Sequence, residues 1–304
     1  MVEMKSIYVL DELVYGKGQK ERLLALGDVK IFEKPTESEI DEAIGKADIM
    51  VLDYILDTRD DILTSMRKGQ FVVLPFTGYN SVKTVKQAVD NGVLVSYVPH
   101  YSTQAVAEHH LALMLSACKN VVQLDNVVRA GGKPAPKDSI ELKGKTVGIV
   151  GYGDIGKRLA ELVKPFGVKI ILCNSTSNNL DELLKESDFV CVTCSLNKQT
   201  ANMISDKQFA LMKQDAILTQ TTGGIVDMSA LYKTLQSGKL YAVGIDDIDK
   251  QVNELPKGLL QHDKVICTWH RAYRTIESEY NRTETCIENI KAFIDGKPIN
   301  LVQL

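Results

Sequence analysis

The chain has 304 residues, of which 44% are hydrophobic and 25% charged, an ordinary balance for a folded globular protein. A formal net charge of −3 and a pI of about 6.0 argue against nucleic acid as the main partner. No apolar run reaches the roughly 18 residues that a membrane span needs, and acidic residues come too early for a signal peptide. We therefore expect a cytoplasmic protein of two domains that does not bind membranes.

Six cysteines lie scattered at positions 118, 173, 191, 194, 267 and 286, mostly within apolar runs. This distribution indicates reduced thiols in a reducing compartment. Cys191 and Cys194 have the spacing CxxC, but they lie in a predicted strand, where residues three apart point to opposite faces. The sequence therefore predicts no metal site.

In the first part of the chain, short apolar strands alternate with helical segments. Strands are predicted at 6–10, 29–32, 48–52, 70–74 and 93–97, and helices at 17–26, 38–46, 60–67 and 82–90. This alternation predicts a parallel α/β sheet covered on both faces. Ligands of such sheets bind beyond the carboxyl ends of the strands. The loops at 53–56 and 75–80, with Tyr54, Thr77 and Gly78, are therefore candidate ligand-site loops.

A boundary is predicted near 99–103, followed by one long apolar helix over 104–129 and a Gly/Pro-rich loop over 131–136. Segment 145–174 then reads as strand, turn, helix and strand, with Gly151, Gly153 and Gly156 in the spacing GxGxxG. The first glycine allows a tight turn, the second a close approach of a pyrophosphate, and the third close packing of the helix on the strand. This context predicts a dinucleotide-binding site. Strands and helices alternate again until a closing helix at about 277–294.

Five segments in this order resemble the D-2-hydroxyacid dehydrogenases, and the resemblance is closest to the glycerate and glyoxylate/hydroxypyruvate reductase group. They are TGYNSV (77–82), VPHYSTQAVAEHHLALML (98–115), GKTVGIVGYGDIGKRLA (144–160), GGIVD (223–227) and TWHRAYRT (268–275). The resemblance implies two Rossmann-like α/β domains. These are a flavodoxin-like substrate domain at 1–99 plus 286–304, and an inserted dinucleotide-binding domain at 100–285 through which the protein would form a homodimer.

The family's chemistry uses an Arg that binds the substrate, a His that transfers a proton, and a Glu that tunes the His. By resemblance, His270 is the proton-transfer residue, and imidazole suits this role near neutral pH. Thr222 stands where the family has its Arg, and Gln251 where it has its Glu; a shift of one loop would instead bring Glu254 near the His. We hypothesise that Arg271 or Arg274 supplies the missing guanidinium; alternatively, both are exposed surface arginines. The resemblance also implies that the substrate carboxylate binds to the backbone N–H groups of Thr77 and Gly78.

The resemblance also implies a set of cofactor contacts beyond the three glycines. They are Thr103, Val106, Tyr152, Asp154, Ile155, Thr193, Thr221, Thr222 and Asp246. NAD-binding domains usually carry a carboxylate at the position of Asn174, and none occurs among residues 174–179. Small polar side chains such as Ser175 could accept a 2′-phosphate, which favours NADP over NAD. Alternatively, Asn174 binds the ribose of NAD.

Three functions remain open from the sequence. The first is an NAD(P)-dependent reductase of a small 2-oxo acid, such as glyoxylate or hydroxypyruvate, with His270 as acid and base. The second is an NAD(P)-binding sensor that has lost turnover. The third is an oxidoreductase whose substrate does not need the family's Arg.

Overall fold

In a computed structural model the chain divides into two compact units, Met1–Ser102 with Thr275–Leu304, and Thr103–Arg274. The structure describes residues 4–57, 59, 61–79, 82–133, 138–248 and 252–303. The boundaries between the two units, at 102/103 and 274/275, differ from the predicted ones. The difference is larger at the second boundary, which we expected at 285/286. Helix α11 (Ile276–Ile294) is unbroken, starts at a capping box on Thr275, and belongs entirely to the first unit.

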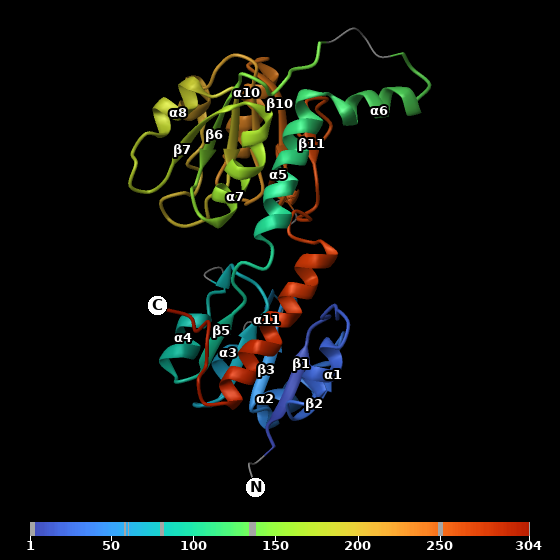
Figure 1. The fold of residues 1–304 in the computed structure, drawn as a ribbon, viewed down its shortest axis with the longest axis vertical. Coiled ribbons are helices and arrows are strands. Elements are labelled where there is room, and N and C mark those ends of the chain that lie inside the picture. Colours follow the sequence, from blue (N-terminus) through green and yellow to red (C-terminus); the bar gives the residue numbers. More distant parts are fainter. Residues whose placement is uncertain are drawn as a thin grey trace. The chain divides into compact units, whose positions relative to one another are not determined.

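The first unit is built on a five-stranded parallel sheet (Figure 1). Its strands are β1 (Ser6–Leu10), β2 (Asp28–Ile31), β3 (Ile49–Leu52), β4 (Phe71–Leu74) and β5 (Leu94–Tyr97). Their order in the sheet is β2-β1-β3-β4-β5, and every neighbouring pair is parallel. This order confirms the predicted flavodoxin-like topology.

Helices cover both faces of this sheet. They are α1 (Gln19–Leu24), α2 (Glu37–Lys46), α3 (Ile62–Ser65), α4 (Val85–Asp90) and α11, with a 3-10 turn, η1, at Tyr54–Asp57. On one face, Cys286 and Ile290 of α11 pack with Ile7 and Phe71, and the Phe71 and Phe293 rings stack at 4.4 Å between centroids. The last helix of the chain therefore completes the core of the first unit.

The second unit is built on a six-stranded parallel sheet. Its strands are β6 (Thr146–Val150), β7 (Lys169–Cys173), β8 (Phe189–Val192), β9 (Ala216–Gln220), β10 (Leu240–Ile245) and β11 (Val265–Cys267). The order is β11-β10-β9-β8-β6-β7. After β7 the chain crosses back to place β8 on the other side of β6, which creates the strand-order reversal where such sheets bind ligands.

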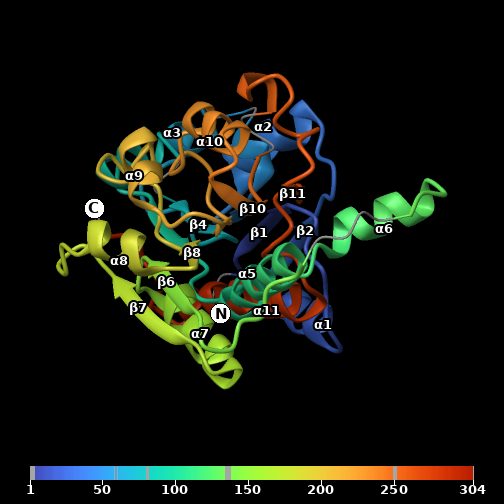
Figure 2. The same cartoon turned by 90° about the horizontal axis from the view of Figure 1, so that it is seen from above.

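The helices of the second unit lie on both faces of its sheet (Figures 1 and 2). Leu113 of α5 (Thr103–Cys118) and Leu159 of α7 (Asp154–Val163) pack in one apolar cluster with Ile149. A second cluster joins Leu183 of α8 (Leu180–Glu186) and Leu231 of α10 (Met228–Gln236). Further elements are α9 (Asp206–Leu211) and the 3-10 turns η3 (Lys164–Phe166) and η4 (Val252–Glu254).

The prediction of one long helix over 104–129 is wrong, because the helix is interrupted at Lys119 and Asn120. Asn120 adopts a left-handed conformation with φ 54°, and its side chain donates to the Tyr241 hydroxyl at 2.7 Å. A separate helix, α6 (Val121–Arg129), follows and extends away from the rest of its unit (Figure 2). Among the residues that the structure describes, no helix has the length and apolar character of a membrane span.

Candidate active site

The glycine turn after β6 is packed against the end of β8. Gly151 has φ 104°, and a Cβ atom there would come within 2.6 Å of the Cα of Cys194. A Cβ on Gly156 would overlap the carbonyl oxygen of Gly151. The Thr193 hydroxyl closes the turn by donating to that carbonyl at 2.6 Å. Both positions therefore require glycine, and Thr193 braces the turn from the neighbouring strand.

Gly153 has a different environment from the other two glycines. It is the N-cap of α7, and a Cβ placed on it would meet nothing within 4 Å. The first backbone N–H groups of α7 have no partner within the helix, so this open position faces the kind of donors that bind phosphate. Two closely packed glycines around one open glycine form a cradle that fits the pyrophosphate of a dinucleotide.

The loop after β7 is organised by Asn174. Its side-chain oxygen accepts from the backbone N–H of Thr176 and of Ser177, both at 2.9 Å, and from the Thr176 hydroxyl at 2.8 Å. Asn174 therefore shapes the loop with the same oxygen that a ribose-binding carboxylate would offer. Ser175 lies exposed within this turn.

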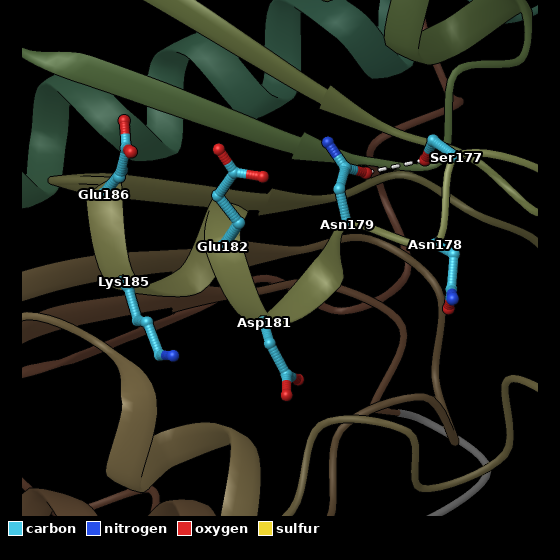
Figure 3. A pocket seen from close by; sticks show the side chains of 7 residues that line it. All are labelled: Ser177, Asn178, Asn179, Asp181, Glu182, Lys185 and Glu186. Atoms are coloured by element: carbon cyan, nitrogen blue, oxygen red, sulfur yellow. Dashed lines mark hydrogen bonds between the residues drawn. The ribbon is translucent and has the colours of Figure 1, made fainter.

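A surface hollow lies between this loop and α8. Its lining residues are Ser177, Asn178, Asn179, Asp181, Glu182, Lys185 and Glu186. In Figure 3, Asp181 and Lys185 point the same way, whereas Glu182 and Asn179 point the opposite way. Three carboxylates and one ammonium group therefore line the hollow.

His270 follows β11 at the carboxyl edge of the second sheet. Its Nδ1 lies 3.3 Å from Oδ1 of Asp247, the second residue after β10. The two side chains are 39% and 20% exposed, so the imidazole reaches solvent while its partner is largely enclosed. The Tyr273 ring packs edge-on against the imidazole at 5.4 Å between centroids. One ring nitrogen is thereby held by a carboxylate.

Asp246 holds the segment that carries His270. It is fully buried and accepts from the Thr268 hydroxyl at 2.6 Å and from the backbone N–H groups of Arg271 and Ala272, both at 2.9 Å. His270 has φ 49°, a left-handed conformation that costs a non-glycine residue about 1 kcal/mol or more. The three hydrogen bonds to Asp246 offset that cost and fix the position of the imidazole.

Two further histidines on α5 extend this network. His109 Nε2 lies 2.9 Å from the Thr268 hydroxyl. His110 is fully buried between the hydroxyls of Thr219 and Thr221, each 3.0 Å from a ring nitrogen. Burial lowers the pKa of His110 to about 3, so this ring is neutral near pH 7. The hydroxyls at the end of β9 are thereby tied to α5.

The matching family model is the NAD binding domain of the D-isomer specific 2-hydroxyacid dehydrogenases, and it spans residues 111–272. A glyoxylate reductase from Aeropyrum pernix is 32% identical over 90% of this chain and 89% of its own length. A hydroxypyruvate reductase from Blautia hydrogenotrophica is 29% identical over 98% of this chain and 99% of its own.

This chain belongs to the D-isomer specific 2-hydroxyacid dehydrogenase family. It is thus a member of a family of oxidoreductases that use a nicotinamide dinucleotide. Two solved structures are also similar. An acyclic imino acid reductase, Bsp5, in complex with NADPH and D-Arg has a TM-score of 0.84 and 27% identity, over 98% of this chain and 100% of that one. A D-lactate dehydrogenase from Aquifex aeolicus with NAD and lactic acid has a TM-score of 0.80 and 26% identity, over 98% of both chains.

Within this family member, several predicted cofactor residues have structural partners. The hydroxyls of Thr193 and Thr221 are used by Gly151 and His110, and the carboxylate of Asp246 is used by the His270 segment. Thr103 opens α5 and Val106 is buried on it, while Tyr152, Asp154 and Ile155 lie in the turn and the first turn of α7.

The structure describes only some of the residues that we predicted to take part in catalysis. Thr222 follows β9 and is half-buried, and Arg271 and Arg274 are exposed. Gln251 lies outside the described residues. Glu254 lines a second surface hollow together with Asp227 and Ser229 at the start of α10, and the carboxylate contact of His270 comes from Asp247.

The predicted substrate-binding residues of the first unit lie at the carboxyl edge of its sheet. Thr77 and Gly78 are exposed after β4, and the Thr77 hydroxyl donates to the Val98 carbonyl at 2.9 Å. Tyr54 begins η1, but its side chain lies outside the described structure.

The sequence analysis missed Asp247, His109 and His110. A signal for Asp247 was present, because Asp246 and Asp247 directly follow the apolar strand that precedes the His270 strand. Neighbouring parallel strands bring the residues beyond their carboxyl ends together. For the described residues, no group of three His, Cys, Asp or Glu side chains is arranged to hold a metal ion.

Proposed function

We propose that the protein reduces a small 2-oxo acid, such as glyoxylate or hydroxypyruvate, to the 2-hydroxy acid. The observation that carries this proposal is the imidazole of His270, held at the carboxyl edge by Asp246 and Asp247 in the sheet that also carries the glycine cradle. The relatives named glyoxylate reductase and hydroxypyruvate reductase support the substrate class.

The chain's own residues account for binding and proton transfer. Gly151, Gly153 and Gly156 would hold the pyrophosphate of the cofactor at the open N-terminus of α7. When bound, the reduced nicotinamide supplies a hydride to C2 of the substrate. His270 donates the proton that the substrate oxygen requires, since imidazole exchanges protons near neutral pH.

The substrate carboxylate needs a cation or backbone N–H donors in place of the family's Arg. Arg271 and Arg274 are our candidates for the guanidinium, and the backbone N–H groups of Thr77 and Gly78 are candidates for the remaining contacts. Arg271→Ala or Arg274→Ala is expected to raise the KM for glyoxylate about tenfold or more, as loss of a charge-assisted hydrogen bond would. Unchanged kinetics in both variants would remove the arginines from this role.

The decisive experiment is NADH and NADPH oxidation by the purified protein with a panel of 2-oxo acids. Thr222→Arg restores the family's guanidinium, and Thr222→Gln is a control of similar reach without charge. We expect the arginine variant alone to lower the KM for glyoxylate. Cofactor binding without turnover on any substrate would instead support the alternative of an NAD(P)-binding sensor.

A second candidate function is the reduction of an imino acid. With Thr222 at the position of the family's Arg, the site lacks the cation that the family has there. The carboxylate of Asp247 lies against the adjacent Gly223, and its Oδ2 is 2.7 Å from the Gly223 nitrogen. A protonated imine is itself a cation and is favoured near a carboxylate. The similar imino acid reductase structure supports this candidate. Turnover of pyruvate or glyoxylate only when methylamine is added would identify it.

We further propose that the cofactor is NADP. No carboxylate stands at Asn174 to repel a 2′-phosphate, and hydroxyl and amide groups surround that position. The carboxylates of Asp181 and Glu182 on α8 would repel a 2′-phosphate and so disfavour NADP. The test must therefore compare both cofactors. Calorimetric titration should give a lower Kd for NADPH than for NADH, and Asn174→Asp should reverse the order. A lower Kd for NADH in the unmodified protein would contradict this.

Finally, we propose that the protein is a homodimer formed through the second unit. Helix α6 has no buried residue and exposes several apolar side chains, which a second copy would cover. A cytoplasmic location stays a prediction.

A further inference from the structure

Asp247 connects His270 to the turn that follows β9. Its Oδ1 lies 3.3 Å from His270 Nδ1, and its Oδ2 accepts the Gly223 N–H at 2.7 Å. Each carboxylate oxygen therefore has its own partner, and the plane of the carboxylate is fixed relative to the imidazole. Gly223 directly follows Thr222, the position where the family carries its Arg.

The backbone around Asp247 is specialised for this contact. A Cβ atom on Gly223 would come within 2.8 Å of the Asp247 carbonyl oxygen, so the backbone of Asp247 packs closely against a glycine at this position. Asp247 and His270 both adopt left-handed conformations, with φ 51° and 49°. Such conformations in non-glycine residues persist where the surroundings impose them and are concentrated at functional sites.

We infer that Asp247 is the positioning residue of His270, in the role that the family gives to a Glu at the position of Gln251. This inference rests on the proposed function, because it concerns the proton that His270 gives to the substrate. Asp247 accepts the Nδ1–H of the imidazole, which leaves Nε2 to carry the proton that is transferred. After the transfer, the ring remains as the Nδ1–H tautomer, the form that hydrogen bonds to Oδ1 of Asp247.

Asp247→Asn tests this directly. The asparagine has one acceptor oxygen, and Gly223 N–H requires it on the side of Oδ2. The amide NH2 then faces His270 Nδ1, which can only accept from it, so the ring must carry its proton on Nε2. We expect the neutral tautomer to change from Nδ1–H to Nε2–H, and kcat to fall roughly 100-fold with little change in KM.

The tautomer is read without cofactor or substrate, from the 15N shifts of histidine-labelled protein at about pH 9, where ordinary histidines are neutral. A His270→Gln spectrum assigns the signals among the five histidines of the chain. Asp263→Asn is the matched control, because Asp263 Oδ1 lies 3.2 Å from Nδ1 of His262 and the Asp263 side chain is 85% exposed. It should leave both the His270 signals and kcat unchanged.

A second variant, Asp247→Ala, imposes no donor on Nδ1 and should show both tautomers and a smaller loss of kcat than Asp247→Asn. Persistence of the Nδ1–H tautomer in Asp247→Asn would overturn the inference even if the enzyme is active. Conversely, a tautomer change in a protein that reduces no substrate would uphold the positioning role and reject the proposed function.

Discussion

The backbone of Gly151 lies directly against the backbone of Cys194, at the point where the chain turns away from the carboxyl ends of β6 and β8. A Cβ atom on Gly151 would come within 2.6 Å of the Cα of Cys194. The turn of the proposed cofactor cradle is therefore also a packing contact between neighbouring strands, so Gly151 has a structural role in addition to its proposed binding role.

Gly151→Ala should impair both stability and cofactor binding. Its φ of 104° is strained for alanine, and the methyl group would force the end of β8 away, for a combined cost of at least about 1 kcal/mol. Gly153→Ala is the matched control, because its φ is −81° and no atom lies within 4 Å of a Cβ there. It should leave thermal unfolding unchanged and weaken only the binding of NADPH, followed by fluorescence. If Gly151→Ala binds NADPH as tightly as the unmodified protein, the cradle is not the cofactor site.

His110 should make the protein less stable in mild acid. Burial lowers its folded-state pKa from 6.5 to about 3, with His109 adding to the effect, whereas the unfolded chain takes up the proton near 6.5. The unfolded state therefore binds more protons over this range, and stability falls as pH decreases from about 6.5 towards about 3.

His110→Gln keeps a donor and an acceptor for Thr219 and Thr221 but does not titrate. The difference in the free energy of unfolding between pH 8 and pH 5, from urea titrations, should be smaller in this variant. His100→Asn is the control, because His100 is exposed and asparagine tolerates its φ of 59°. An identical pH dependence in His110→Gln and the unmodified protein would contradict the prediction.

Asp11 should have the opposite effect from His110 on how stability depends on pH. Burial, followed by the charge of Asp53, raises its pKa from 3.8 to about 7, although Arg282 Nη1 lies 3.6 Å from its Oδ2. The folded protein then holds a proton that the unfolded chain has lost, so this group reduces stability as pH rises from about 4 to 7.

Asp11→Asn should therefore raise the melting temperature at pH 8, with a gain of roughly 1 kcal/mol or more. Asp53→Asn is the contrasting variant, since Asp53 accepts from Arg282 Nη1 at 2.8 Å and its loss leaves a buried guanidinium with weaker pairing. It should destabilise the fold. Destabilisation by Asp11→Asn at pH 8 would show that its ionised form is needed.

The α6 helix should be required for dimerisation. Val121, Leu124 and Val128 are 52%, 39% and 60% exposed, and such a group of exposed apolar side chains on one helix is typical of an interaction surface. Val128→Glu combined with Leu124→Glu should halve the mass measured by light scattering and leave the circular dichroism of the fold intact. Asn126→Glu adds one negative charge at an exposed polar position of the same helix and should leave the mass unchanged. A monomeric unmodified protein would reject the proposed dimer.

The fold class and the glycine turn followed from the sequence because both depend on local patterns. Alternating apolar strands and helices predict parallel sheets, and the GxGxxG spacing depends on residues within one strand, turn and helix. The break between α5 and α6 could not be predicted from the sequence, because no glycine or proline occurs there. Asn120 turns the chain there through a hydrogen bond to Tyr241, which is 121 positions away in sequence.

The sequence by itself determined the family and the glycine turn. It also pointed to His270 as the proton-transfer residue and to Thr222 at the position of the family's Arg, and both of these stay predictions. Only the tertiary structure decided which carboxylate contacts His270. The family pattern places Gln251, which has no carboxylate, at the position of the family's Glu. The sheet instead places β10 beside both β9 and β11, and so brings Asp247 to His270 and to Gly223. That partnership depends on strand order and on two left-handed backbone positions, which arise from packing between distant segments rather than from the residues next to them.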